Sequence, residues 1–184
     1  MSSAERRNVL AASASTTESS ASSTTESVLA EAASIAEGAI ESARVSLMAQ
    51  LPFMDVALWR MPIVARLQEN AFETDGRLLW FDVARVIDLY RKSPNEVLRG
   101  YFHTIMHCVF RHPFDDKHPA RALWDIACDA SVEATAIELL GTGFPSAQDG
   151  TAKRMLGKIR ENCPTLTAQS IYRALIGVGE ENPP

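Results

Sequence analysis

One stretch of the chain constrains the fold more than any other, because it is apolar around nearly its whole circumference when arranged as a helix. In residues 94–111, PNEVLRGYFHTIMHCVFR, the apolar side chains are Val97, Leu98, Tyr101, Phe102, Ile105, Met106, Cys108, Val109 and Phe110. A helix with apolar side chains on every face is covered by its neighbours. The sequence therefore predicts a central helix with other elements packed around it, within a single domain.

The start and the end of this helix are both marked. Ser93 can cap the first backbone N–H groups, Pro94 suits the first helical position, and Glu96 would complete a Ser-x-x-Glu capping box. Pro113 disfavours the helical conformation of His112, the residue before it. We therefore expect the helix to run from residue 94 to about 111.

A narrow polar stripe interrupts the apolar surface. Gly100, His103, Thr104, His107 and Arg111 fall at spacings that place them along one line of the helix. A buried polar group without a partner costs about 1–3 kcal/mol, so this stripe should face a ligand, a wet cleft or polar partners. Histidines one turn apart have the HxxxH geometry by which a helix holds zinc. The structural alternative is a pair of histidines that hydrogen-bond inside the core.

The helix expected over residues 119–140 offers further ligands. Asp125, Asp129 and Glu133 form an acidic stripe at four-residue spacing. If the two helices pack antiparallel, this stripe faces the histidines. A catalytic zinc needs three protein ligands, and we favour Asp129 as the third, with Asp125 as an outer or substitute ligand.

His112 is a further possible ligand, on one condition. It lies nine positions after His103, on the opposite side of an ideal helix. It can join the site only if the chain leaves the helix at Arg111.

The rest of the chain divides into a tail, a domain and a short end. Residues 1–24 are rich in Ser, Thr, Ala and Glu, and we expect them to be disordered; residues 25–178 form the domain, and 179–184 a C-terminal tail. The elements expected besides those above are a long Ala-rich helix from about residue 25, a short helix between Pro52 and Pro62, strands near 70–74 and 77–81 joined at Asp75-Gly76, and helices at 82–93, 149–161 and 167–176.

Composition and charge argue against nucleic-acid binding and a membrane span, and they suggest a cellular compartment. The net charge is −5 and the basic residues form no run, which argues against nucleic-acid binding. No segment approaches the roughly eighteen apolar residues of a membrane span. The three cysteines are widely spaced without a CxxC pair, which fits a reducing compartment, so we expect a cytoplasmic protein.

Four blocks, in this order and spacing, resemble a known family. They are ETDGRLLWF, EVLRGYFHTIMHCVFRHPF, LWDIACDASVE and LTAQSIYRAL, and the resemblance covers roughly residues 45–176. The chain is similar to the bacterial, zincin-like "putative metallopeptidase domain" that often precedes a von Willebrand factor A-like (VWA) domain. The resemblance implies an α+β, mainly α fold, with a small β-hairpin or sheet beside the HxxxH helix.

The family pattern is HExxH, followed by an Asp on the next helix. By position, His103 and His107 match the zinc ligands and Asp129 the family's Asp, while Thr104 stands at the position of the catalytic Glu. In this mechanism zinc polarises a water molecule and the Glu takes its proton, which contributes roughly 10²–10⁴-fold in rate. The resemblance thus implies a metal site with weak or no hydrolysis.

Three functions remain open at the level of sequence. The first is a zinc hydrolase of peptides, in which Glu96 or Glu133 is the conceivable base and residues 77–81 offer a strand edge to the substrate. The second is a non-catalytic module that binds metal or peptide; the resemblance implies partners such as a MoxR-type ATPase or a VWA-like protein. The third is a purely structural helical domain.

Overall fold

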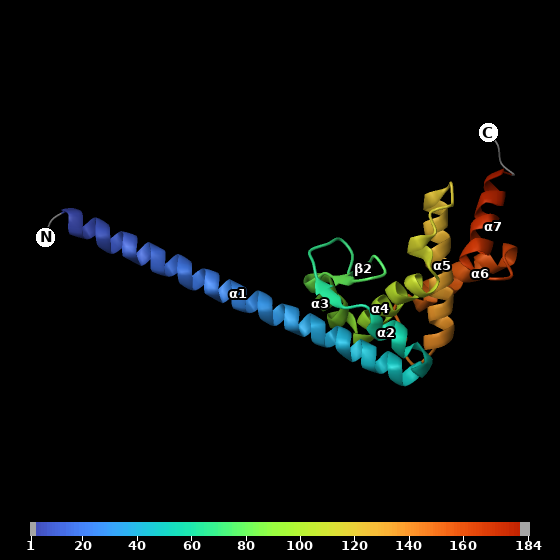
Figure 1. Ribbon diagram of the computed structural model, residues 1–184, viewed down its shortest axis with the longest axis horizontal. Coiled ribbons are helices and arrows are strands. Elements are labelled where there is room, and N and C mark those ends of the chain that lie inside the picture. Colours follow the sequence, from blue (N-terminus) through green and yellow to red (C-terminus); the bar gives the residue numbers. More distant parts are fainter. Residues whose placement is uncertain (1–2, 181–184) are drawn as a thin grey trace.

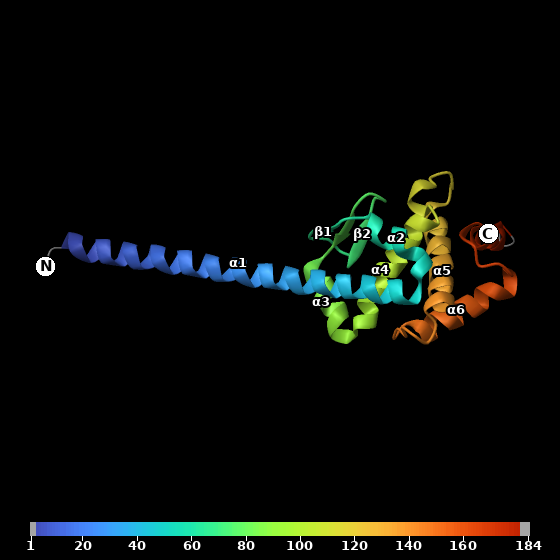
Figure 2. The same ribbon diagram turned by 60° about the horizontal axis from the view of Figure 1, so that its bottom comes forward.

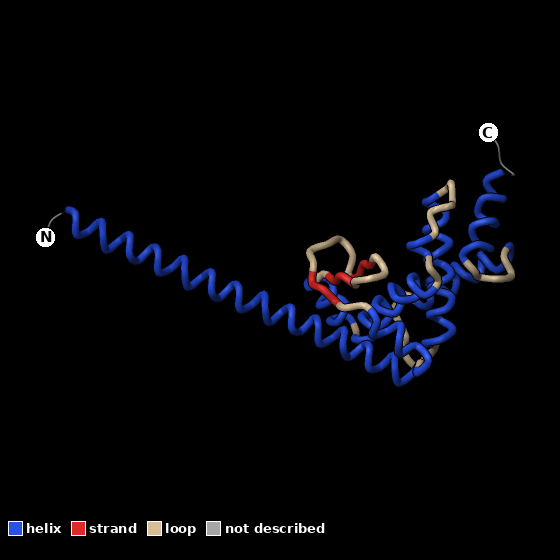
Figure 3. Tube along the Cα trace, viewed as in Figure 1, coloured by secondary structure: helices blue, strands red, loops and turns tan. Residues whose placement is uncertain are grey.

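The computed structural model describes residues 3–180, and for residues 3–24 and 178–180 it describes the backbone alone. The protein is mainly helical with one small three-stranded sheet (Figures 1 and 3), which confirms the predicted class. Its elements are α1 Ser3–Gln50, η1 Pro52–Met54, α2 Asp55–Arg60, β1 Ile63–Ala65, β2 Phe72–Thr74, β3 Leu79–Phe81, α3 Val83–Lys92, α4 Pro94–Val109, η2 His112–Phe114, α5 Arg121–Leu140, α6 Asp149–Asn162 and α7 Ala168–Glu180.

Helix α1 extends far beyond the rest of the molecule at its N-terminal end (Figures 1 and 2). Its C-terminal part packs on α3 and α4, where Ala36, Ile40 and Leu47 are fully buried. The helix begins at Ser3 and is continuous across residue 24, where the sequence predicts the end of a disordered tail. The boundaries at 1–24, 25–178 and 179–184 remain predictions, and residues 1–2 and 181–184 lie outside the described part of the chain.

Helix α4 lies at the centre of the larger core, as predicted. It packs against α1, α3, α5 and β2, and its buried side chains include Leu98, Phe102 and Ile105. Its C-terminal end differs from the prediction, because Val109 and Phe110 are exposed. Met106, in the same part of the helix, is buried, so only one side of this end is exposed.

The N-terminus of α4 has the predicted cap but not the capping box. The Ser93 hydroxyl oxygen accepts a hydrogen bond from the Asn95 backbone N–H at 3.2 Å. Glu96 does not turn back to Ser93; its carboxylate accepts from the Ala147 N–H at 2.9 Å and from the Ser146 hydroxyl at 3.1 Å. A distant loop thus competes successfully for the carboxylate that local geometry assigned to the cap.

The sheet has the strand order β1-β3-β2. The predicted hairpin is formed by β2 and β3, which pair antiparallel, and the Asp75 carboxylate closes its turn by accepting from the Arg77 and Leu78 N–H groups at 2.8 and 2.9 Å. Gly76 has the positive φ of +83° that the turn requires.

Strand β1, which the sequence did not predict, pairs parallel with β3. The expectation that residues 77–81 offer a free edge is therefore wrong, because β3 is paired on both sides. The free edge next to α4 belongs to β2.

Helix α5 runs antiparallel to α4 and joins the two cores. Its C-terminal half contributes Val132, Ala136 and Leu140 to the core around α4. Its N-terminal half packs with α6 and α7 around Trp124. None of the helices formed by the described residues has an apolar run of the length that a membrane span requires.

Candidate metal site

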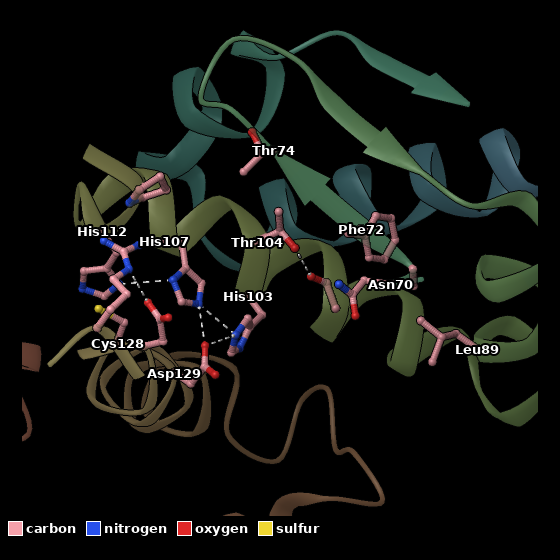
Figure 4. Close-up of a pocket in the computed structure, with 15 residues that line it drawn as sticks. Asn70, Phe72, Thr74, Leu89, His103, Thr104, His107, His112, Cys128 and Asp129 are labelled. Atoms are coloured by element: carbon pink, nitrogen blue, oxygen red, sulfur yellow. Dashed lines mark hydrogen bonds and ion pairs between the residues drawn. The ribbon is translucent and has the colours of Figure 1, made fainter. Parts of the chain in front are cut away.

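A cavity of about 570 Å³ opens between the free side of β2 and the helices α4 and α5 (Figure 4). This volume is typical of pockets that bind small molecules. Its walls come from β2 and the residues before it, from α3, from α4 and the turn after it, and from α5. The lining residues are Asn70, Ala71, Phe72, Thr74, Leu89, Gly100, His103, Thr104, His107, His112, Pro113, Arg121, Asp125, Cys128 and Asp129.

Gly100 allows β2 to approach α4 this closely. A Cβ at position 100 would lie 3.2 Å from the Phe72 ring, closer than nearly all real Cβ contacts. The missing side chain lets Phe72 pack on the backbone of α4, where its ring also meets Tyr101 edge to face at 6.1 Å. The close packing therefore explains a glycine inside a helix, where it is about 1 kcal/mol less favourable than alanine.

Three donor atoms converge at one point of the cavity. His103 Nε2 and His107 Nε2 are 3.0 Å apart, and Asp129 Oδ1 lies 3.2 Å from His107 Nε2 and 3.7 Å from His103 Nε2. Figure 4 shows the three side chains pointing toward one another from α4 and α5. The antiparallel packing of these helices brings Asp129 opposite the two histidines, as the sequence predicted.

These distances fit a metal ion. Donor atoms that share a tetrahedral zinc at bond lengths of about 2.0–2.1 Å lie roughly 3.3 Å from one another. His103, His107 and Asp129 are also the one group of three or more His, Cys, Asp or Glu side chains, among the described residues, whose donor atoms lie close enough together to hold an ion. Two imidazoles and one carboxylate form a donor set that divalent transition metals favour.

Each histidine has a partner at its second ring nitrogen. His107 Nδ1 lies 3.2 Å from His112 Nδ1, and His103 Nδ1 lies 3.8 Å from Glu133 Oε2. If His107 donates its Nδ1–H to His112, its Nε2 keeps a lone pair directed at the converging atoms. Outer partners of this kind fix the tautomer and orientation of metal-binding histidines.

His112 thus takes a different place from the one that the sequence suggested. Arg111 adopts the left-handed conformation with a φ of 65°, and the chain leaves the helix there, as this hypothesis required. The turn buries His112 and directs it to the outer nitrogen of His107. His112 therefore stands behind His107 instead of joining the three converging atoms.

The imidazole of His103 and the carboxylates of Asp129 and Glu133 shift one another's pKa values. Burial opposes protonation of His103, but the carboxylates of Asp129 and Glu133 outweigh burial and raise the pKa of His103 to about 9. The same contacts with the histidines lower the pKa of Asp129 and of Glu133. Burial, with the charge of His107, lowers the pKa of His112 to about 4. A neutral His112 can accept a hydrogen bond from His107 Nδ1–H.

Arg99 holds Glu133 in its place behind His103. Its buried guanidinium donates to Glu133 Oε1 and to Asp149 Oδ1, both at 2.8 Å, and to the Ala136 carbonyl at 3.2 Å. Asp149 begins helix α6, so the network connects three helices. The sequence reasoning missed this network, although a lone arginine in the apolar run EVLRGYF is a signal that could have indicated it.

Three acidic residues considered for the site lie outside the group of converging donor atoms. Asp125 lines the cavity but pairs with Arg121 at 3.0 Å and is not part of the converging group. Glu96, a conceivable base, is bound to the loop at residues 146–147. Glu133, the other conceivable base, faces His103 Nδ1, whereas the three donor atoms converge at Nε2.

Thr104 lies in the cavity wall between His103 and His107. Its hydroxyl donates to the Gly100 carbonyl at 3.0 Å, one turn back in the same helix (Figure 4). The hydroxyl is therefore engaged with the helix backbone. Apart from Asp125 and Asp129, no carboxylate of the described chain lines the cavity.

The comparison with protein families gives a clear result. The family model described as "putative metallopeptidase domain" matches residues 36–183, most of the chain. The chain belongs to this family. The match includes α4 and α5, the helices that carry His103, His107 and Asp129. No curated protein and no solved structure matches the chain significantly.

Proposed function

We propose that this metallopeptidase domain binds a zinc ion through His103, His107 and Asp129, in a zincin-like cleft that accepts a peptide but hydrolyses it weakly or not at all. The observation that carries the proposal is the convergence of His103 Nε2, His107 Nε2 and Asp129 Oδ1 within 3.0–3.7 Å. When bound, zinc would supply Lewis acidity next to the polypeptide in the cleft.

The free edge of β2 supports the peptide part of the proposal. Residues Phe72 and Thr74 line the cavity, and β2 pairs with another strand on one side only. An extended peptide can add to such an edge through backbone hydrogen bonds. Its backbone would then run past His103 and His107, which line the same cavity.

The weak hydrolysis follows from Thr104. A threonine hydroxyl is not a base at neutral pH, and this one already donates to the helix backbone. General-base assistance is worth roughly 10²–10⁴-fold, so its loss removes most of the catalytic rate while the metal ligands are retained. A role in binding, with a MoxR-type ATPase or a VWA-like protein as partner, is consistent with this loss.

The first experiment is the metal content of the purified protein, measured by mass spectrometry. We expect about one zinc per chain, and none in the His103→Ala and His107→Ala variants. Asp125→Ala is the matched control, since Asp125 lines the cavity outside the converging group. Metal-free wild-type protein, or equal zinc in all the variants, would contradict the proposed site and favour a structural role of the histidines.

Restoring the carboxylate tests the cleft. In the zinc-loaded protein, Thr104→Glu should raise hydrolysis of a quenched fluorescent peptide library by roughly 10²-fold or more. Thr104→Gln is the control, because glutamine has the shape of glutamate without its charge. This variant should not hydrolyse the peptides faster than the wild type. If Thr104→Glu keeps its zinc and its fold but gains no activity, the zincin-like arrangement of the cleft is wrong.

A further inference from the structure

A second cavity, of about 720 Å³, lies on the other side of α4 from the metal site. We call it the α2–α4 groove. It is formed by η1 and α2 on one side, by the last turn of α4 on another, and by the β2–β3 turn together with η2. Its residues include none of the converging ligands, so it is separate from the site proposed above.

The walls of the α2–α4 groove expose large apolar side chains. Phe53 is 70% exposed, Val56 is 68% exposed and Phe114 is 54% exposed. Val109, at the end of α4, is also exposed and lines the same groove. Isolated apolar side chains on a surface are ordinary, but a group of them around one concavity indicates an interaction site.

The charged side chains that line the groove are basic, and the carboxylate of Asp75 lies near its residue Cys108. Its two charged lining residues are Arg60 and Arg111. Neither arginine forms an ion pair with any of the residues that the structure describes. Both arginines are exposed, so their guanidinium groups are accessible beside the apolar concavity. They would attract carboxylates.

The backbone around the groove is fixed in unusual conformations. Arg111 has a φ of 65°, in the left-handed region that favours glycine, and it is the one non-glycine residue of the described chain with a positive φ. Gly76 also has a positive φ, and the Phe114 ring occupies the space that a Cβ would fill there. These two positions set the wall that carries Phe114 and the Arg111 side chain.

We propose that the α2–α4 groove binds a segment of a partner protein that presents apolar side chains flanked by Asp or Glu. The apolar side chains would enter between Phe53, Val56 and Phe114, and the carboxylates would pair with Arg60 and Arg111. The groove is concave and carries only two basic residues, which fits a peptide segment better than the flat, polybasic surfaces that bind membranes. The proposal does not depend on the metal.

The test uses two fluorescein-labelled peptides, EELFLEE and KKLFLKK, in EDTA, with binding followed by fluorescence anisotropy. We expect saturable binding of the acidic peptide and at least tenfold weaker binding of the basic one. The double variant Arg60→Gln, Arg111→Gln should weaken binding of the acidic peptide by about 3–10-fold. Phe53→Ser should weaken it by at least about fivefold, because aromatic anchors dominate interfaces of this kind.

Two controls match these changes. Arg173→Gln removes an exposed arginine of α7, and Leu67→Gln removes an exposed apolar side chain outside the groove. Both should bind the acidic peptide like the wild type, and circular dichroism checks the fold of every variant. Equal binding of the two peptides, variants without effect, or no saturation below about 1 mM would overturn the proposal.

Two other occupants give distinct results. If a second copy fills the groove, sedimentation will show a dimer that the Phe53→Ser and double arginine variants dissociate. If a membrane fills it, vesicles with phosphatidylserine will bind the wild type and not the double variant. Either result would overturn the assignment to a partner segment. Because EDTA removes the metal, failure here is distinguishable from failure of the zinc site.

Discussion

At the scale of single residues, the partners behind the two histidines distinguish this cluster from a chance pair. An HxxxH pair on a helix is common, and by itself it fixes neither the tautomer nor the ring orientation. Here His112 stands at Nδ1 of His107 and Glu133 near Nδ1 of His103. Both Nε2 atoms are thereby left to meet Asp129. This arrangement prepares the two rings for a metal before one is bound.

Glu133 gives a direct test of this preparation. Glu133→Gln keeps the shape of the side chain and removes the charge that faces His103, so we expect the affinity for zinc to fall by roughly 10–100-fold. The fold should survive, because Arg99 keeps its 2.8 Å ion pair with Asp149. The measurement is competition with a chromophoric chelator of known zinc affinity.

Glu138→Gln is the control, since Glu138 is an exposed residue of the same helix. It removes the same charge from α5 at a distance from His103. If both variants lose affinity equally, the effect is one of overall charge, and Glu133 does not position His103.

At the scale of elements, the sequence predicted what depends on local periodicity. The start of α4 at Pro94, the hairpin around Gly76 and the alignment of Asp129 with the histidines all follow from helix and turn geometry, and the structure confirms them. The missed features depend on contacts between segments that are distant in sequence. Strand β1 exists only through its pairing with β3, and Glu96 leaves its cap for residues 146–147.

Two glycines in helices give a prediction at this scale. Gly157, in α6, has no atom within 4 Å of the position of an added Cβ, whereas Gly100 has the Phe72 ring at 3.2 Å. Gly157→Ala should stabilise the protein by about 0.5–1 kcal/mol through helix propensity. Gly100→Ala should gain less or lose stability, because Phe72 and β2 must shift.

Urea denaturation of the two variants beside the wild type measures this difference. Each variant is the control of the other, because both replace a helical glycine with alanine and only the atoms near the new Cβ differ. Equal stabilisation by both substitutions would show that β2 moves away from α4 without cost. The cavity wall would then be more adaptable than the packing of Phe72 implies.

At the scale of the whole molecule, the candidate metal site lies where the two cores meet. His103 and His107 belong to α4, which is surrounded by the larger core, while Asp129 belongs to the half of α5 that packs on α6 and α7. A metal held by all three would link the two halves of the protein. Metal binding should therefore stabilise the global fold and not only the cavity.

This link should make the fold more resistant to heat when zinc is bound. Zinc at about 100 times its dissociation constant should stabilise the fold by about 2.7 kcal/mol, which corresponds to a rise in Tm of roughly 5–10 °C for a protein of this size. Calorimetry with and without zinc measures the rise, and EDTA should reverse it. Magnesium at the same concentration should have no effect, because it prefers octahedral oxygen ligands. His107 Nε2 takes part in the two shortest contacts of the cluster, at 3.0 Å with His103 and at 3.2 Å with Asp129. If the rise in Tm persists in His107→Ala, the zinc therefore binds elsewhere.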